Sequence, residues 1–598
     1  MSTNLPPSGP PGPPPPPPGS AEYLDSGGGR PIDPAPHPGG RGGLRKGLLV
    51  GGGVVGLAAV GVGAWAAVSF LATGPQPAEA LPASTLAYLS VDLDPSGGQK
   101  IEALRTLNKF PAFEDEVGID TDDDIRKAIF DEIQGELDCA GLDFEDDVEP
   151  WLGDRAAVAA VDSGGETPDP VFVLQVKDAD AAGKGMQAIK DCAAGEGGDA
   201  EGGWSIEGDW AVIAQTDKIA ETVTDDAAEG SLADDEDFQK WVGEAGDSGV
   251  VTMYAAPALG DYLAEHADDL FGFPFGALGV SDVDCAIAEP VLPPGEETLP
   301  GDDDAGGVDS CDSEGGYEGE VDSSQSMVSD ELKQTLEDFK GMAGVLRFDD
   351  GSIEMEFASD GDVAGSNLLA SDAGGDTITS LPEDTAAAIG VGFSEGWFAD
   401  LLEMYQPYVA GLGEDLTLDD MVDELETQTG LTIPDDIETL FGDSAALALG
   451  TDFDPEALFE SSDGSDVPVA LKVDGDPEEI EAVLEKLRAQ FPDEETLVFD
   501  TDAEGDTIVI GPNEAFRKQM LDDGGLGDND VFKDVVREVD DASVVLFVNV
   551  NELEDLVEES MGEFDQELVD NVKPISGFGV SGYVDDGVAH SIMRLTTD

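Results

Sequence analysis

Basic residues are scarce in this sequence of 598 residues, which contains 27 lysines and arginines against 132 aspartates and glutamates. The formal net charge is −105 at pH 7. Proteins that bind nucleic acids or anionic lipid headgroups neutralise phosphates with clusters of Lys and Arg, so this charge balance opposes both kinds of partner. We therefore predict no nucleic-acid binding. Weak binding of divalent cations to the acidic surface is compatible with the composition.

Histidine is also rare, and the usual motifs of catalytic and cofactor sites are missing. The only histidines are His37, His266 and His590. There is no HExxH zinc motif, no GxGxxG that follows a strand, and no GxxxxGK[ST] loop for phosphate. Paired carboxylates of the glycosidase type are not excluded, but so many acidic residues make any particular pair uninformative. The sequence therefore predicts no cofactor and favours a protein without enzymatic activity.

Two stretches resemble known functional loops but lack residues that those loops need. "GDSG" (Gly246–Gly249) resembles the nucleophile loop of chymotrypsin-like proteases, which place a histidine base earlier in the chain. The only earlier histidine is His37, in the N-terminal tail. "DLDPSGGQKIEA" (Asp92–Ala103) begins like an EF-hand loop, but Ala103 stands where the twelfth, acidic ligand is needed. We predict neither protease activity nor a dedicated metal site.

The N-terminus combines a Pro/Gly-rich tail with one long apolar run. Residues 1–46 include an unbroken run of prolines, Pro13–Pro18, and their composition favours an extended, disordered tail. The run "GLLVGGGVVGLAAVGVGAWAAVSFLA" (Gly47–Ala72) has no charged residue and exceeds the about 20 residues that cross a bilayer. We therefore predict a transmembrane helix at Gly47–Ala72.

The flanks of this run predict its orientation. Three basic residues, Arg41, Arg45 and Lys46, precede it, which by the positive-inside rule keeps the tail cytoplasmic and places the rest of the chain outside. The segment "AEA" (Ala78–Ala80) resembles a signal-peptidase site, so a cleaved, secreted form is an alternative. The length of the apolar run favours an uncleaved anchor. The predicted localisation is the cell membrane, single-pass, with extracytoplasmic C-terminal domains.

Cysteine usage agrees with an exported chain. All four cysteines follow the predicted span: Cys139, Cys192, Cys285 and Cys311. An even number of cysteines in an oxidising compartment favours disulfides, and the lack of a CxxC pair argues against a metal site. Four cysteines permit three pairings. We favour Cys139 with Cys192, and Cys285 with Cys311.

The exported part repeats itself. "GLDFEDDVEPWLGDRAAVA" (Gly141–Ala159) matches "GLTIPDDIETLFGDSAALA" (Gly430–Ala448) without a gap. Further blocks recur in the same order, and they include Leu81–Leu93 with Leu381–Phe393, Pro170–Lys190 with Pro468–Arg488, Gly208–Asp217 with Gly505–Glu514, Phe238–Ala255 with Phe532–Asn549, and Phe348–Asp360 with Val584–Asp598. We predict an internal duplication, with one copy at 81–360 and another at 381–598.

Segments outside the repeats complete the predicted domain organisation. Residues 73–80 and 361–380 are predicted linkers before each copy. The offset between matching blocks falls from about 300 to 236 residues at the last hairpin, so the first copy carries an insertion of about sixty residues. This insertion is predicted at about 271–329, where the sequence is rich in Gly, Pro, Asp and Glu.

Successive β runs joined by short turns indicate the fold class. Val158–Val161 with Val171–Val176, and Gly344–Phe348 with Ile353–Phe357, are two such pairs. Strands joined by short turns are antiparallel, and amphipathic helices occur between other strands. The sequence therefore predicts an α+β fold, in which one transmembrane helix precedes two tandem copies of a mainly antiparallel sheet covered by helices.

Several of these features together resemble a known family. They are the anchor after a Pro-rich tail, "LPASTLAYLSVDLDP" (Leu81–Pro95), "FPAFEDEVG" (Phe110–Gly118) and "WLGDRAAVA" (Trp151–Ala159). The exported part is similar to the bacterial family catalogued as a domain of unknown function, number 3352. The resemblance implies a membrane-anchored envelope protein and carries over no catalytic or binding residue.

Three hypotheses for function follow. The first is a non-catalytic envelope module that binds an unknown partner or has a structural role. The second is a carrier that holds an apolar ligand between the two copies, and the third is a hydrolase that uses two carboxylates with divergent pKa values. The lack of any catalytic motif favours the first.

Overall fold

The computed structural model describes the chain in blocks, which are residues 76–92, 98–116, 124–136, 141–165, 167–193, 202–246, 249–267, 330–349, 351–361, 371–410, 417–451, 453, 464–490, 499–522, 524–554, 556 and 566–598. The predicted tail 1–46, the predicted span Gly47–Ala72 and the predicted insertion 271–329 lie outside these residues. Among the described residues, no helix combines the length and apolar character that crossing a membrane requires.

Residues 76–361, here called the first half, contain eight strands and eight α-helices in their described part. The strands are β1 (Thr85–Asp92), β2 (Leu152–Val161), β3 (Asp169–Val176), β4 (Gly203–Glu207), β5 (Trp210–Ala214), β6 (Val251–Ala255), β7 (Met342–Asp349) and β8 (Ser352–Asp360). The helices are α2 (Gly98–Leu107), α3 (Pro111–Glu116), α4 (Ile125–Glu136), α5 (Ala179–Ala193), α6 (Asp217–Glu229), α7 (Glu236–Glu244), α8 (Pro257–Glu265) and α10 (Asp330–Glu337). Short helical turns are η1 (Pro77–Ala80), η2 (Phe144–Val148) and η3 (Leu232–Asp234).

Residues 371–598, here called the second half, contain the remaining described elements. The strands are β9 (Thr385–Gly392), β10 (Ser444–Gly450), β11 (Val469–Asp474), β12 (Thr501–Glu504), β13 (Thr507–Ile510), β14 (Val544–Asn549), β15 (Ile575–Asp585) and β16 (Val588–Thr597). The helices are α11 (Ala373–Thr379), α12 (Trp397–Ala410), α13 (Leu418–Thr429), α14 (Asp435–Phe441), α16 (Pro477–Arg488), α17 (Glu514–Leu521), α18 (Asp530–Val535) and α20 (Gln566–Val572). Short turns are η6 (Leu526–Asp528), η7 (Val539–Asp541) and η8 (Val550–Leu553).

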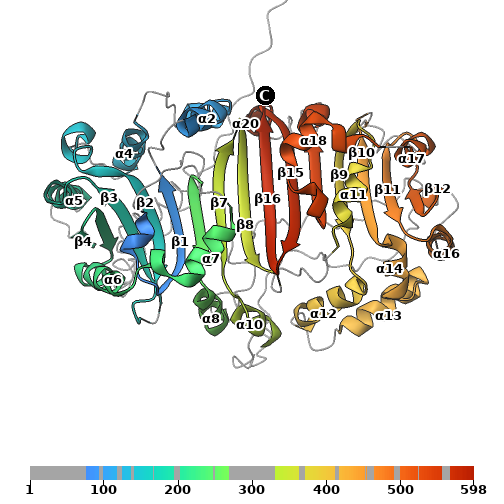
Figure 1. Cartoon of the computed structure of the whole chain (residues 1–598), viewed down its shortest axis with the longest axis horizontal. Helices are drawn as coiled ribbons and strands as arrows, with labels where there is room; N and C mark the ends of the chain where they lie inside the picture. Colours follow the sequence, from blue (N-terminus) through green and yellow to red (C-terminus); the bar gives the residue numbers. More distant parts are fainter. Residues whose placement is uncertain are drawn as a thin grey trace, which may run out of the picture. The chain divides into compact units, whose positions relative to one another are not determined.

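All sixteen described strands form one antiparallel sheet. Its order is β12-β13-β11-β10-β9-β14-β15-β16-β8-β7-β6-β1-β2-β3-β5-β4, which Figure 1 shows from β12 on the right to β4 on the left. The two hairpin pairs expected from the sequence, β2 with β3 and β7 with β8, are antiparallel neighbours. The predicted α+β class with a mainly antiparallel sheet is therefore confirmed for the described part of the chain.

The two halves of the sheet meet edge to edge. Strand β8 pairs with β16 in antiparallel register, with Met355 opposite Met593. Counted outward from this seam, the first half runs β8-β7-β6-β1-β2-β3-β5-β4 and the second runs β16-β15-β14-β9-β10-β11-β13-β12. Strands in the same chain order therefore occupy the same place in each half. The two predicted lobes share one sheet, whereas the sequence pattern did not reveal how they join.

Local sequence explains many of the element boundaries. The β15–β16 hairpin turns at Asp586 and Gly587, whose φ angles are 46° and 84°, as a two-residue turn with an Asp/Gly preference requires. Helices α6 and α7 begin after Thr216 and Asp235, whose side chains accept backbone N–H bonds of the first turn. These are turn and cap signals that the chain supplies without help from tertiary contacts.

Helices cover both faces of the sheet. Successive side chains of a strand point to opposite faces, so each strand contributes apolar residues to both. The face that carries Tyr88, here the Tyr88 face, packs against η1, α6 and α7 in the first half and against α11, α17 and α18 in the second. The opposite face carries Leu89 and is called the Leu89 face. It packs against α2, α3 and α5 in the first half and against α14 and α16 in the second.

The predicted linkers contain regular structure. Within 361–380 the chain forms α11, whose Gly374, Gly375 and Ile378 are buried. Within 73–80 it forms η1, whose Ala78 and Ala80 are buried in the core of the first half. Both segments start with small residues and lack a long apolar pattern, which is why the composition alone indicated linkers. The other predicted domain boundaries stay predictions.

Candidate functional site

The "WLGDR" motif places two charged side chains on opposite faces of β2. Asp154 and Arg155 are neighbours in this strand, so their side chains alternate. Gly153 before them cannot be larger, because a Cβ there would lie 2.6 Å from Cβ of Gln175 on β3. Gly442 of the matching "LFGDS" motif is held in the same way, since its Cβ would lie 2.3 Å from the carbonyl oxygen of Asp474. The motif therefore brings the start of the strand close to its neighbour.

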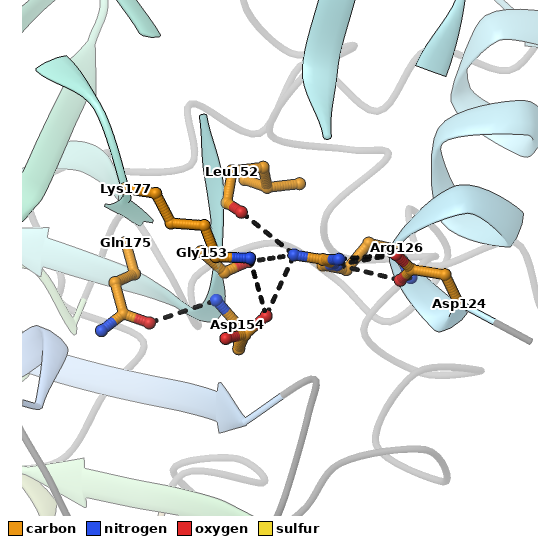
Figure 2. A network of polar contacts seen from close by, with 7 residues as sticks. All are labelled: Asp124, Arg126, Leu152, Gly153, Asp154, Gln175 and Lys177. Carbon is orange, nitrogen blue, oxygen red and sulfur yellow. Dashed lines mark hydrogen bonds and ion pairs between the residues drawn. The ribbon is translucent and has the colours of Figure 1, made fainter. Parts of the chain in front are cut away.

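Asp154 belongs to a polar network centred on Arg126, which Figure 2 shows between α4 and the start of β2. The guanidinium donates to Oδ1 of Asp154 at 3.0 Å and to the carbonyl oxygen of Leu152 at 3.0 Å. It also binds both carboxylate oxygens of Asp124, at 2.9 and 2.6 Å. Hydrogen bonding to the Asp124 carboxylate, aided by the charge of Asp154, raises the pKa of Arg126. These bonds join Arg126 of α4 to the start of β2, so the network acts as a clamp that fixes α4 to β2.

Arg155 points to the Tyr88 face and lines a cavity. Its Nε donates to Oδ2 of Asp92 at 2.9 Å, and the two side chains are only 7% and 9% exposed. Asp92 is also the first residue of the EF-hand-like stretch. In the structure it is the ion-pair partner of Arg155. Within the described residues, no group of three or more His, Cys, Asp or Glu side chains could hold a metal ion. The absence of a dedicated metal site stays a prediction.

A second charged cluster lies on the Tyr88 face at the seam. Glu354 on β8 accepts from Arg347 Nε at 2.7 Å and from Arg594 Nη1 at 2.6 Å. Burial alone would raise the pKa of Glu354, but these two hydrogen bonds outweigh it and lower the pKa. Glu356 contacts Arg347 as well, yet burial raises its pKa. The cluster joins the halves by a carboxylate shared between one arginine of each half.

Gly246 of the "GDSG" stretch packs against this cluster. Its φ is 82°, and a Cβ there would lie 2.6 Å from Oε2 of Glu356. Asp247 and Ser248 lie outside the described residues. The glycine is thus required by a close approach at the seam, which agrees with interpreting this stretch as a turn.

Only Cys192 among the four cysteines lies in the described part of the chain. It ends α5 and is disulfide-bonded. Cys139, Cys285 and Cys311 lie outside the described residues. The pairing of Cys139 with Cys192 and of Cys285 with Cys311 therefore stays a prediction.

Part of this chain matches a known family model. Residues 48–267 match the model described as "Protein of unknown function (DUF3352)". These residues are here called the DUF3352 segment. The predicted resemblance is confirmed over this range. No curated protein and no solved structure matches the chain.

The DUF3352 segment contains the "WLGDR" network, the Arg155 cavity and all strands from β1 to β6. Strands β7 and β8 and the whole second half lie beyond it. The family description states no activity, so it assigns no role to these residues.

Exposed apolar side chains gather outside the DUF3352 segment. Of the ten large apolar side chains that are most exposed in the described residues, nine lie in the second half, and the tenth is Ile101. On the Leu89 face, Leu447 on β10 is 46% exposed, Ile389 on β9 is 40% and Met593 on β16 is 38%. The sequence gives no signal for this surface, because the strands of the two halves have the same pattern and those of the first half are covered by helices.

The helices explain this difference between the halves. In the first half, Leu104, Phe113 and Ile125 from α2, α3 and α4 cover the Leu89 face beside Leu89 and Met253. In the second half, α12 packs against α13, α14 and α10. Helix α13 buries no residue, and three further non-aromatic apolar side chains of α12 and α13 are exposed, namely Met404, Met421 and Leu425. We call Ile389, Leu447, Met593 and these three residues the apolar surface.

Proposed function

We propose that this protein is a single-pass, membrane-anchored extracytoplasmic module without catalytic activity, and that it binds an envelope partner through the apolar surface. The observation that supports this best is the exposure of Ile389, Leu447 and Met593 on a sheet face that helices cover in the first half. Monomeric proteins rarely leave large contiguous apolar patches uncovered unless these bind something. The three methionines in the surface add side chains that adapt to a partner.

The strong acidity specifies the partner further. With a net charge of −105, the chain repels anionic surfaces at long range and attracts cationic ones. The proposed partner is therefore a protein or peptide that presents apolar side chains flanked by basic residues.

Membrane anchoring is the second part of the proposal. The apolar run Gly47–Ala72 and the preceding Arg41, Arg45 and Lys46 support a span with the tail inside. The alternative of cleavage at Ala78–Ala80 fits the structure less well, because Ala78 and Ala80 are buried in the core. A peptidase needs an extended, accessible substrate. The uncleaved anchor is therefore the form that we propose.

Internal duplication is the third part. The identical strand order of the two halves, counted from the β8–β16 seam, supports an origin by duplication of one eight-stranded unit. Under this proposal the first half kept covered faces, while the second half gained the apolar surface. Binding then belongs to the second half, and the seam holds it in a fixed position relative to the anchored first half.

A position-specific crosslink tests the binding surface. A photo-reactive amino acid is placed at Leu447 of the full chain in intact cells, and the matched control carries it at Ile101, which is 49% exposed in the first half. We expect a discrete adduct from position 447 that disappears when Ile389→Lys is added. Equal adducts from both positions, or none from 447, would contradict the proposal.

Protease accessibility tests the topology. Protease added to intact cells should remove the mass that follows Ala72 and spare the tail before Arg41. Protection of the C-terminal half in intact cells, with digestion only after lysis, would overturn the proposed orientation.

A second candidate is a carrier of an apolar ligand. It is favoured by the same apolar side chains, since the three on the sheet lie on a face shared by both halves and Met593 lies at the seam. An open surface suits a protein partner better than an acyl chain, which carriers usually enclose. Lipid extraction of the purified chain separates the two: copurified lipid that is lost in the Leu447→Lys variant would favour the carrier.

A further inference from the structure

A cavity of about 270 Å³ opens on the Tyr88 face of the first half, away from the apolar surface. Its floor is formed by β1, β2 and β6, and its walls by η1 and α7. The cavity lies within the DUF3352 segment. Its size is just below the range of typical ligand pockets, so a ligand there would be small.

The polar lining consists of hydroxyl groups, one ion pair, and the residues Gln76 and Glu79. Tyr88, Ser90 and Thr252 contribute hydroxyls from neighbouring strands, and the Asp92–Arg155 pair lies beside them. Burial raises the pKa of the Tyr88 phenol, which therefore stays protonated, and the phenol is hydrogen-bonded to the Ser90 side chain and to the backbone of Ala78. The ring of Phe238 meets Tyr88 edge-on and supplies an apolar wall.

The corresponding place in the second half is filled. Register puts Ala388, Gly390 and Gly392 where the first half has Tyr88, Ser90 and Asp92. A Cβ on Gly390 would lie 2.8 Å from the carbonyl oxygen of Gly374, and one on Gly392 would lie 2.7 Å from the Gly374 nitrogen. Helix α11 therefore rests directly on β9. The fold therefore does not require a cavity at this place in each half. In the first half, a cavity is present and is surrounded by larger, polar residues.

The lining selects the chemistry of the ligand. The charges of Asp92 and Arg155 cancel and Glu79 adds a negative charge, so the site has no excess positive charge for a phosphate or a carboxylate. Hydroxyls both donate and accept, and they pair well with other hydroxyls. From these features we infer that the cavity binds a neutral, hydroxyl-bearing molecule of about monosaccharide size. Its ring would pack on Phe238 while its hydroxyls meet Thr252 and Ser90, whose hydroxyl is held in place by Tyr88.

Titration of the full chain with monosaccharides tests this inference. D-glucose, D-galactose, D-mannose and D-arabinose are the probes, and L-alanine and L-glutamine represent zwitterions of similar size. Binding is followed by saturation-transfer NMR and calorimetry. We expect at least one sugar to bind and neither amino acid to do so.

Two variants locate the binding. Ser90→Leu should fill the cavity and weaken sugar binding by more than tenfold, and Thr252→Val should weaken it by about three- to tenfold because one hydroxyl is lost. Thr222→Val is the control, since this half-buried threonine on α6 lies outside the lining. Circular dichroism shows whether each variant folds. If Ser90→Leu does not fold, Thr252→Val decides the result.

Three results would overturn the inference. They are no binding of any sugar, tighter binding of an amino acid than of any sugar, and sugar binding that both cavity variants leave unchanged. Binding that falls in the cavity variants and not in the control supports it.

Discussion

At the residue scale, the same motif serves the two halves differently. Asp154 lies in a paired network, whereas the matching Asp443 is exposed at the start of β10. The glycine before each aspartate has the same role, since a Cβ at either position would collide with the next strand. The shared Gly-Asp pair therefore reflects a common backbone requirement at the glycine more than a common function of the aspartate side chain.

Asp154→Asn should destabilise the protein by about 1–3 kcal/mol, because Arg126 loses a charged acceptor in a site where its side chain is only 11% exposed. The expected destabilisation lies at the low end of this range, because Asp154 is 32% exposed and solvent screens its ion pair with Arg126. Asp443→Asn is the matched control and should change the free energy of unfolding by less than about 0.5 kcal/mol. Urea unfolding measures both. Equal effects at the two positions would contradict the role given to Arg126.

At the element scale, α11 shows why a segment of small residues can be structural. Gly374 and Gly375 allow the helix to lie against the backbone around Ser543 and Val539. A Cβ on Gly375 would lie 1.7 Å from the carbonyl oxygen of Val539. A linker would tolerate a larger residue here, and a packed helix would not.

Gly375→Ala should therefore destabilise the protein by about 1–3 kcal/mol or more, because the helix must move away from Val539. Gly243→Ala in α7 is the control: this glycine is exposed, nothing lies near its added Cβ, and alanine favours helix. The control should stabilise by about 0.5–1 kcal/mol. Chemical unfolding measures the free energy of unfolding of both variants. No change in that free energy for Gly375→Ala would show that residues 361–380 act as a linker.

The seam strand β8 carries two carboxylates whose environments differ although both side chains are 12% exposed. Arg347 and Arg594 hold the pKa of Glu354 below its ordinary value, so its ionised form stabilises the folded state. Burial raises the pKa of Glu356, so its ionised form costs stability. The two residues should thus respond to pH with opposite signs.

Glu354→Gln should destabilise the protein at pH 7, and the difference from the natural chain should shrink as pH falls below about 4.3, the pKa of an unfolded glutamate. Glu356→Gln should destabilise less at pH 7, because the natural carboxylate pays a burial cost there. The natural chain should gain stability relative to Glu356→Gln as pH falls through the raised pKa. Unfolding curves between pH 3.5 and 8 test this, and parallel pH profiles for the two variants would refute it.

At the scale of the whole molecule, charge repulsion should govern stability. Of the 132 acidic residues, 129 follow Ala72. Salt shortens the Debye length from about 10 Å at 0.1 M to about 3 Å at 1 M, which weakens repulsion between exposed carboxylates. The melting temperature should therefore rise with salt.

The measurement is the melting temperature of a chain that begins at residue 76, in sodium chloride from low millimolar to about 1 M. Divalent cations should act at lower concentration without saturating at a single tight site. A flat salt series would show that repulsion is negligible. A steep, saturable shift with micromolar calcium would reveal a specific metal site.

For one pair of matching blocks, the ungapped sequence match and the register in the sheet differ by one residue. This difference shows a limit of sequence comparison. An ungapped match of Phe238–Ala255 with Phe532–Asn549 pairs Thr252 with Leu546. In the sheet, Leu546 lies opposite Ile389, and the corresponding position opposite Leu89 is Met253. Because strand side chains alternate, the slip moves Thr252 to the cavity and Met253 to the Leu89 face. Only strand pairing decides between these registers.

The sequence by itself determined the α+β class, the hairpins and the order of the repeated blocks. Turn residues such as Asp586 and Gly587, helix caps such as Thr216, and strand alternation act over a few neighbouring residues, so they can be read locally. The tertiary structure alone decided that β8 and β16 join edge to edge, that Arg126 holds Asp154, and that α12 and α13 leave the Leu89 face exposed. These features depend on contacts between residues far apart in the chain, whose energies no local pattern contains.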